Sequence, residues 1–324
     1  MVATILRISL LVLLLAPALV PQQKAAKEQP IDNDSVIKVN VNLVNILASV
    51  RDKRNALIST LEKADFKLYE DGAEQEIKYF TRESDLPLTI GLLIDVSRSQ
   101  ENLLGVTGRA ATSFFEKVLR PKDEAFVISF GKDSELLQDT TSSPRLLEKA
   151  LRGLKVSAPV GGIHPGPVPT IQNQAGTVLY DAVFLAAEDR LRKEVGRKVI
   201  LLITDGEDTG SRTSRAKAIE AAQKADAVIY SIYYVDNRNY GGDMGTLKRM
   251  SEETGGGVFE VKRNLSLDQI FKEIENEMRT QYAIGFAPTN SKKDGTFRKI
   301  EFKMANKDYK VQARKGYYAI DTDF

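Results

Sequence analysis

Short, almost purely apolar runs alternate with helical patterns through the middle of the chain. Residues 88–94 are the clearest run, and their length and lack of alternation predict a strand buried on both faces of a parallel sheet. Further strands are predicted at residues 124–130, 135–140, 198–204, 228–235 and 258–261. Helices are predicted at residues 103–119, 143–154, 178–193, 213–225, 243–254 and 265–279. This alternation is typical of an α/β fold with a doubly wound, mostly parallel sheet, which we assign to residues 87–280.

Both ends of the chain show the alternating pattern of half-buried strands instead. Within residues 36–86, the apolar positions are odd-numbered from Ile37 to Leu43 and even-numbered from Val44 to Val50. This change of phase indicates a bulge or a strand that passes between two sheets. Glu70-Asp71-Gly72 signals a hairpin turn, after which residues 77–80 are expected to pair. Residues 281–324 contain three more strand patterns, at residues 281–287, 297–304 and 309–313.

Neither terminal block has enough apolar surface to form a core of its own. We therefore expect residues 36–86 and 281–324 to form one β-sandwich, with the Rossmann-like α/β domain inserted between them. Two independent flanking β pieces are the alternative.

The N-terminus carries a targeting pattern. Arg7 is the only charged residue before Lys24, residues 8–16 form a compact apolar segment, and Ala16-Pro17-Ala18 matches an A-x-A cleavage site. These features predict a signal peptide over residues 1–18, followed by a polar linker over residues 19–35. We expect a secreted or periplasmic protein with no transmembrane span after cleavage, and an uncleaved N-terminal anchor is the alternative.

Composition excludes several classes of function. The 46 Lys and Arg residues nearly balance 44 Asp and Glu residues without a basic block, so nucleic acid is not an expected partner. The chain has no cysteine, which excludes disulfides, thiolate zinc sites and cysteine nucleophiles. Its single histidine, His164, lies in an irregular stretch rich in Gly and Pro over residues 156–176. We therefore expect no catalytic residue and no enzyme, with a metal-assisted hydrolase that uses His164 as the alternative.

Polar side chains follow the apolar runs where ligands bind in open α/β sheets. Asp95, Ser97 and Ser99 follow the first run, Thr177 precedes a helix, and Asp205 ends the run at residues 198–204. Carboxylate and hydroxyl oxygens suit Mg²⁺, Mn²⁺ or Ca²⁺, so convergence of these loops would give a site with one ligand missing. The alternatives are ordinary ones: Asp95 and Thr177 as helix caps, and Asp205-Gly206 as a turn.

These five residues resemble the metal-ion-dependent adhesion site (MIDAS) of the von Willebrand factor type A (VWA) domain. The family pattern is D-x-S-x-S, then a Thr, then an Asp in a T/S-D-G context, and all five positions here hold the family's residue types. The resemblance covers about residues 88–279. The terminal blocks also resemble the flanks of bacterial "VWFA-related" proteins described from Acidobacteria. The resemblance covers residues 40–83 at one end, and residues 298–304 (RKIEFKM) and 314–319 (RKGYYA) at the other.

The resemblance implies how the site would work. Ser97, Ser99 and Thr177 would coordinate the cation directly, and Asp95 and Asp205 would bind partly through water. The open position would take a carboxylate from a partner protein, or from a carbohydrate or matrix component, and Arg98 and Gln100 are expected to point away from the metal. The expected function is cation-dependent binding, and the alternatives are the hydrolase and an envelope-assembly component whose metal serves folding only.

Overall fold

A computed structural model describes residues 43–82, 86–157, 176–236 and 241–320 of the chain. The predicted signal peptide (residues 1–18), the linker (19–35), the first alternating segment (36–42) and His164 with its surrounding loop (158–175) lie outside these residues. Residues 41–324 belong to one compact unit.

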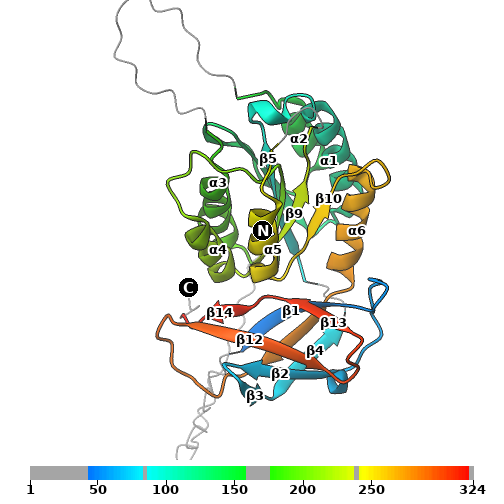
Figure 1. Cartoon of the computed structure of the whole chain (residues 1–324), viewed down its shortest axis with the longest axis vertical. Coiled ribbons are helices and arrows are strands. Elements are labelled where there is room, and N and C mark those ends of the chain that lie inside the picture. The colour runs from blue at the N-terminus through cyan, green and yellow to red at the C-terminus, as the bar shows by residue number, and fades with distance from the viewer. Residues whose placement is uncertain (1–42, 83–85, 158–175, 237–240, 321–324) are drawn as a thin grey trace, which may run out of the picture. The chain divides into compact units, whose positions relative to one another are not determined.

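A six-stranded sheet forms the centre of the α/β part (Figure 1). Its order is β10-β9-β8-β5-β6-β7, and all neighbours are parallel except β6 and β7. The strands are β5 (Leu88–Asp95), β6 (Glu124–Phe130), β7 (Ser134–Thr141), β8 (Arg197–Thr204), β9 (Ala227–Tyr233) and β10 (Val258–Glu260). Every residue of β5 and β8 is buried, as their apolar runs predict for central strands. The predicted mostly parallel sheet is confirmed, with antiparallel β7 at one edge.

Helices cover both faces of this sheet (Figure 1). One face packs against α1 (Leu104–Val118), α2 (Pro144–Arg152) and α6 (Leu267–Arg279). The other packs against α3 (Leu179–Leu185), α4 (Arg215–Lys224) and α5 (Met244–Thr254). The helix predicted at residues 178–193 is present as a continuous helical stretch over residues 179–193, but its type changes. α3 is followed by a π-helical turn, η3 (Ala186–Arg190), and a 3-10 turn, η4 (Leu191–Lys193). None of the helices in the described ranges has the length and apolar character to cross a bilayer.

Two four-stranded sheets each combine strands from both ends of the chain. Their orders are β13-β1-β11-β4 and β14-β12-β2-β3. The strands are β1 (Val44–Arg51), β2 (Phe66–Glu70), β3 (Ala73–Gln75), β4 (Ile77–Arg82), β11 (Tyr282–Phe286), β12 (Phe297–Met304), β13 (Lys310–Ala313) and β14 (Gly316–Tyr318). Long-range antiparallel pairs such as Ile46–Ile284 and Leu68–Phe302 join the two ends. Side chains from both sheets share one apolar cluster that includes Leu68, Tyr282 and Phe286.

The pairing around the predicted hairpin differs from the expectation. β2 pairs with the short strand β3, whereas β4, which contains residues 77–80, pairs with β11 in the other sheet. The chain therefore changes sheets at Glu76, and Gln75 and Ile77 on either side of it are both buried. β3 and β14 have three residues each, too few for an alternation that the sequence pattern could reveal.

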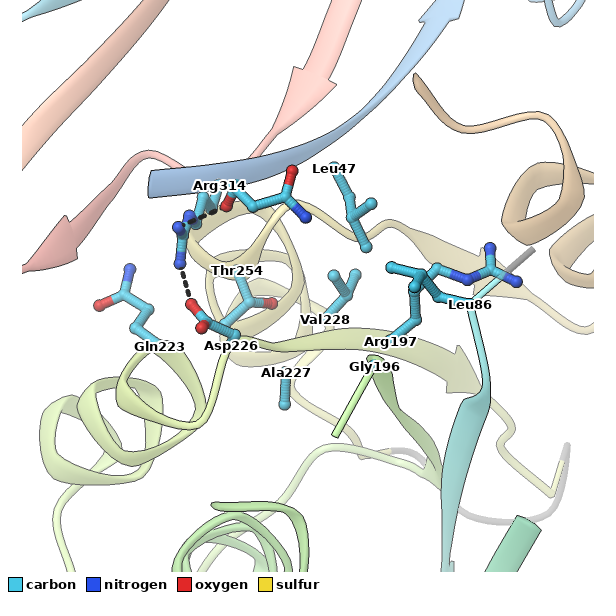
Figure 2. Close-up of a pocket in the computed structure, with 11 residues that line it drawn as sticks. Leu47, Leu86, Gly196, Arg197, Gln223, Asp226, Ala227, Val228, Thr254 and Arg314 are labelled. Atoms are coloured by element: carbon cyan, nitrogen blue, oxygen red, sulfur yellow. Dashed lines mark hydrogen bonds and ion pairs between the residues drawn. The ribbon is translucent and has the colours of Figure 1, made fainter. Parts of the chain in front are cut away.

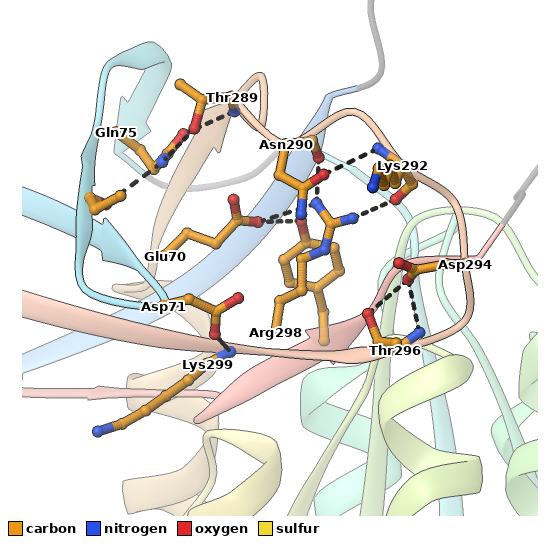
Figure 3. A network of polar contacts seen from close by, with 12 residues as sticks. Glu70, Asp71, Gln75, Thr289, Asn290, Lys292, Asp294, Thr296, Arg298 and Lys299 are labelled. Carbon is orange, nitrogen blue, oxygen red and sulfur yellow. Dashed lines mark hydrogen bonds and ion pairs between the residues drawn. The ribbon is translucent and has the colours of Figure 1, made fainter.

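A buried ion pair lies inside the second four-stranded sheet (Figure 3). The Arg298 guanidinium lies 3.7 Å from the Glu70 carboxylate and donates to the backbone carbonyls of Asn290 and Lys292. The Tyr317 hydroxyl donates to Glu70, and burial together with this hydrogen bond raises the pKa of Tyr317. The buried Arg298 side chain therefore fixes the loop between β11 and β12 through its hydrogen bonds to these two carbonyls.

Glu277, near the end of α6, connects the α/β part with the terminal strands. Its carboxylate is 1% exposed and pairs with the Arg51 guanidinium. It also accepts hydrogen bonds from Ser49 Oγ (3.2 Å), Tyr230 Oη (3.1 Å) and Gln312 Nε2 (2.6 Å). These partners come from β1, β9 and β13, so one buried carboxylate joins α6 to strands of two different sheets.

Candidate metal centre

The strand order places two of the predicted site residues at the switch point of the sheet. After β5 the chain first builds β6 and β7 on one side, and then β8, β9 and β10 on the other. The loops that leave the carboxyl ends of β5 and β8 therefore lead to helices on opposite faces of the sheet, and ligands in such sheets usually bind between two loops of this kind. Asp95 is the last residue of β5, and Asp205 directly follows β8.

Asp95 is held by the strand end and by the neighbouring strand. Its Oδ1 accepts from the Ser97 backbone N–H (2.8 Å), and its Oδ2 accepts from the Thr204 hydroxyl (2.5 Å). The residue is 1% exposed, and Thr204 is fully buried. Thr204 was not among the predicted site residues, and the only sequence signal for it is its place before Asp205-Gly206.

Hydroxyl groups connect the loop after β5 to Asp205. The hydroxyl oxygens of Ser97 and Ser99 lie 2.9 Å apart, and Ser99 Oγ donates to Asp205 Oδ2 (2.6 Å). Asp205 Oδ1 accepts from the Glu207 backbone N–H (3.1 Å). Four of the five predicted residues, all except Thr177, therefore lie in one buried or half-buried polar cluster built from oxygen atoms.

Thr177 lies at the same edge of the sheet. Its neighbour Val178 donates a backbone hydrogen bond to the Gly131 carbonyl (2.9 Å), and a Cβ at Gly131 would lie 3.5 Å from the Ser97 nitrogen. Thr177 is 9% exposed, and within the described ranges its hydroxyl makes no hydrogen bond to the other four residues. The structure therefore brings Thr177 near the cluster through its backbone, but does not join its side chain to it.

The Thr177 side chain does not cap α3, so the helix-cap alternative is wrong for this residue. The first backbone N–H groups of α3 are satisfied by Asp208 and Ser211 instead. Asp208 Oδ1 accepts from the Tyr180 N–H (3.1 Å), and Ser211 Oγ accepts from the N–H groups of Tyr180 and Asp181, both at 3.1 Å. The Thr177 hydroxyl is therefore not required to start the helix.

The backbone at position 206, directly after Asp205, requires a glycine. Its φ is +85°, and a Cβ at this position would lie 2.4 Å from the Asp243 carbonyl oxygen. The Asp243 N–H donates to the Asp205 carbonyl (2.8 Å), so the segment before α5 packs directly against this turn. Only glycine combines this backbone conformation with so close an approach.

Gln100 lies differently from the expectation. It is 3% exposed, and its amide nitrogen is 3.2 Å from Asp205 Oδ2 and 3.1 Å from the Tyr234 carbonyl. Arg98 is exposed, as predicted for a residue that points away from the site. The three-residue 3-10 turn η2 (Arg98–Gln100) causes the difference, because it rotates successive side chains to different sides.

The donor set fits a hard divalent cation. In the described part of the chain, no three His, Cys, Asp or Glu side chains gather in a metal-type cluster, so a cation here would need the hydroxyl groups as well as the two carboxylates. The pKa of the Asp95 carboxyl is raised to about 6, first by burial and also by the Asp205 carboxylate, while hydrogen bonds from Ser97 and Thr204 act in the opposite direction. A cation beside the two carboxylates would offset this unfavourable burial of charge.

This raised pKa predicts how the stability of the cation-free protein changes with pH. Because the folded state binds the Asp95 proton more tightly than the unfolded state, whose value is near 3.8, the stabilising contribution is complete below about pH 4 and lost as the pH rises through 6. A difference of about two pKa units corresponds to about 3 kcal/mol. Unfolding of the wild type and of Asp95→Asn with chelator, between pH 4 and 7, measures this contribution as the difference between the two proteins. A difference that stays constant over this range would contradict it.

A cavity lies at the opposite ends of these strands (Figure 2). Gly196, Ala227 and Val228, at or next to the amino ends of β8 and β9, line it together with Leu47 of β1. The Arg314 guanidinium lies at one side of it and pairs with Asp226. None of the predicted site residues lines this cavity.

Comparison with known proteins gives distant structural similarities. No protein-family model matches the chain, and no curated protein matches its sequence. The conserved hypothetical protein BatB from Bacteroides thetaiotaomicron is 18% identical, with a TM-score of 0.42 over 60% of this chain and 97% of that chain. The vWF domain of the type V pili tip protein Mfa5 from Porphyromonas gingivalis is 13% identical, with a TM-score of 0.43 over 60% of this chain and 95% of that chain.

A third similar structure is proximal thread matrix protein 1 from the mussel byssus, with a zinc-occupied MIDAS motif. It is 16% identical, with a TM-score of 0.46 over 63% of this chain and 48% of that chain, so the chain spans about half of its length. These similarities are distant, and the description of the α/β part as a doubly wound, mostly parallel sheet rests on its own strand order.

Proposed function

We propose that this protein is a secreted or envelope binding protein that uses a divalent cation to capture an acidic group of a partner protein. The observation that carries the proposal is the cluster of two carboxylates and two hydroxyl groups at the switch point of the sheet. Asp95, Ser97, Ser99, Thr177 and Asp205 would hold Mg²⁺, or Mn²⁺ or Ca²⁺ in its place. A cation with few direct carboxylate ligands retains positive charge, which favours a carboxylate at its open position.

The proposal includes the organisation of the whole chain. Residues 1–18 would direct export and residues 19–35 would act as a linker. Residues 36–86 and 281–324 would form the two halves of a β-sandwich, with the binding domain at residues 87–280 inserted between them. The shared apolar cluster of the two four-stranded sheets supports the sandwich. The protein would not be an enzyme.

Capture experiments with chemically blocked carboxylates test this function. Residues 19–324 are immobilised and exposed to extracellular and envelope material with Mn²⁺, and bound protein is eluted with EDTA. We expect EDTA-released partners that disappear when the material is first amidated with carbodiimide and an amine, because amidation removes the carboxylates. Capture that is unaffected by either EDTA or amidation would contradict the proposal.

A further inference from the structure

Gln100 is the one buried residue of the turn η2, in which Ser99 is half-buried and Arg98 is exposed. Within η2 and just beyond it, Arg98 and Glu101 are exposed, whereas Gln100 is 3% exposed. The turn is closed by the Gln100 N–H, which donates to the Ser97 carbonyl (2.9 Å). The same residue that fixes the backbone between Ser97 and Ser99 therefore sends its side chain into the site.

The amide group of Gln100 contacts the loops of two other strands. Its nitrogen is within hydrogen-bond distance of Asp205 Oδ2 (3.2 Å), after β8, and of the Tyr234 carbonyl (3.1 Å), after β9. A glutamine amide has two N–H donors, so both acceptors can be satisfied at once. Gln100 thus connects three loops at the carboxyl edge of the sheet.

The Asp205 carboxylate is held by hydrogen bonds at both of its oxygens, and Gln100 donates one of them. Oδ2 accepts from Ser99 and Gln100, and Oδ1 accepts from the Glu207 backbone N–H. Three donors from two loops therefore set the position of the carboxylate before any cation binds. An amide does this without adding charge, so the cation would still face only the carboxylates of Asp95 and Asp205.

We propose that Gln100 is a positioning residue for the cation site, acting through Asp205. This inference rests on the proposed function. Partners that orient metal ligands typically contribute 10–100-fold to metal affinity. Gln100→Met keeps the length of the side chain and removes both donors, and we expect it to raise the Kd for Mn²⁺ by about 10–100-fold.

Asn102 provides a matched control. Its side chain donates to Asp236 Oδ2 (2.7 Å), so it links the loop after β5 to the segment after β9 without contacting Asp205. We expect Asn102→Ala to leave the Kd for Mn²⁺ unchanged. Equal weakening by both variants would show that Gln100 only ties loops together, and an unchanged Kd in Gln100→Met would likewise overturn the inference. A wild-type protein that binds no Mn²⁺ would overturn the proposed function itself.

A second measurement needs no cation. Unfolding with EDTA is compared for Gln100→Met, Asp205→Asn and the double variant. If Gln100 acts through Asp205, the effects of the two substitutions are not additive. Additive effects would mean that Gln100 stabilises the fold independently of Asp205, and would overturn the inference.

Discussion

Replacing Asp95 with asparagine should make the cation-free protein more stable and, at the same time, remove its ability to bind a divalent cation. Asp95 is 1% exposed and the pKa of its carboxyl is raised to about 6, so at pH 7 the fold contains a buried charge that it disfavours. Asparagine has nearly the same shape without the charge. We expect a gain of about 3 kcal/mol in the free energy of unfolding with EDTA at pH 7. Denaturant unfolding and Mn²⁺ titration of the same variant measure the two effects.

The control for this substitution is Asp133→Asn. Asp133 is exposed in the turn between β6 and β7, close to the same edge of the sheet. We expect Asp133→Asn to change neither the free energy of unfolding nor cation binding. If Asp95→Asn is less stable than wild type with EDTA, the fold needs the Asp95 charge and the electrostatic account of the site is wrong. If the variant still binds Mn²⁺ like wild type, Asp95 is not part of a cation site.

The largest loss of stability is expected at Glu277, whose partners do not include any proposed metal ligand. Glu277→Ala removes a buried carboxylate and leaves Arg51, Tyr230 and Gln312 without their common acceptor. Breaking a buried ion pair by removing one partner typically costs about 3–5 kcal/mol. We expect a loss of this size in denaturant unfolding. Mn²⁺ binding should be unchanged, because Glu277 makes no contact with the cluster around Asp95.

Glu275→Ala is the matched control on the same helix. Glu275 pairs with Arg279 at 3.0 Å, and the two side chains are 21% and 35% exposed. A partly exposed pair four residues apart on a helix contributes about 0.3–0.5 kcal/mol. A loss below about 1 kcal/mol in Glu277→Ala would contradict the role of this carboxylate as the main polar connection between α6 and the terminal strands.

The buried strands of the α/β part could be predicted because their sequences allow little else. A run such as residues 88–94 is apolar on both faces, and only a central strand covered by helices satisfies such a run. The position of Asp95 then followed, because the run ends there. The same reasoning predicted Asp205. In the structure Ser99 donates to Asp205 and Thr204 donates to Asp95, so both carboxylates lie in one polar cluster.

Other features depend on contacts that a single sequence does not display. Gln100 looks like a solvent-exposed loop residue until the 3-10 turn shows which side it faces. The change of sheets at Glu76 depends on pairing between β4 and β11, which are about 200 residues apart. Ser211 and Asp208 cap α3 from a loop that comes later in the chain, so local sequence reasoning assigned that role to Thr177 as an alternative.

Calorimetric titration of Mg²⁺ and Mn²⁺ into EDTA-treated residues 19–324, beside Thr177→Ala, tests the central claim most directly. We predict saturable binding of one cation per chain in wild type and weaker binding in Thr177→Ala, whose hydroxyl is the one proposed ligand not yet joined to the cluster. Binding that is saturable but unchanged in Thr177→Ala would remove Thr177 from the site. No saturable binding of either cation by the wild-type protein would contradict the account of this edge of the sheet as a metal centre.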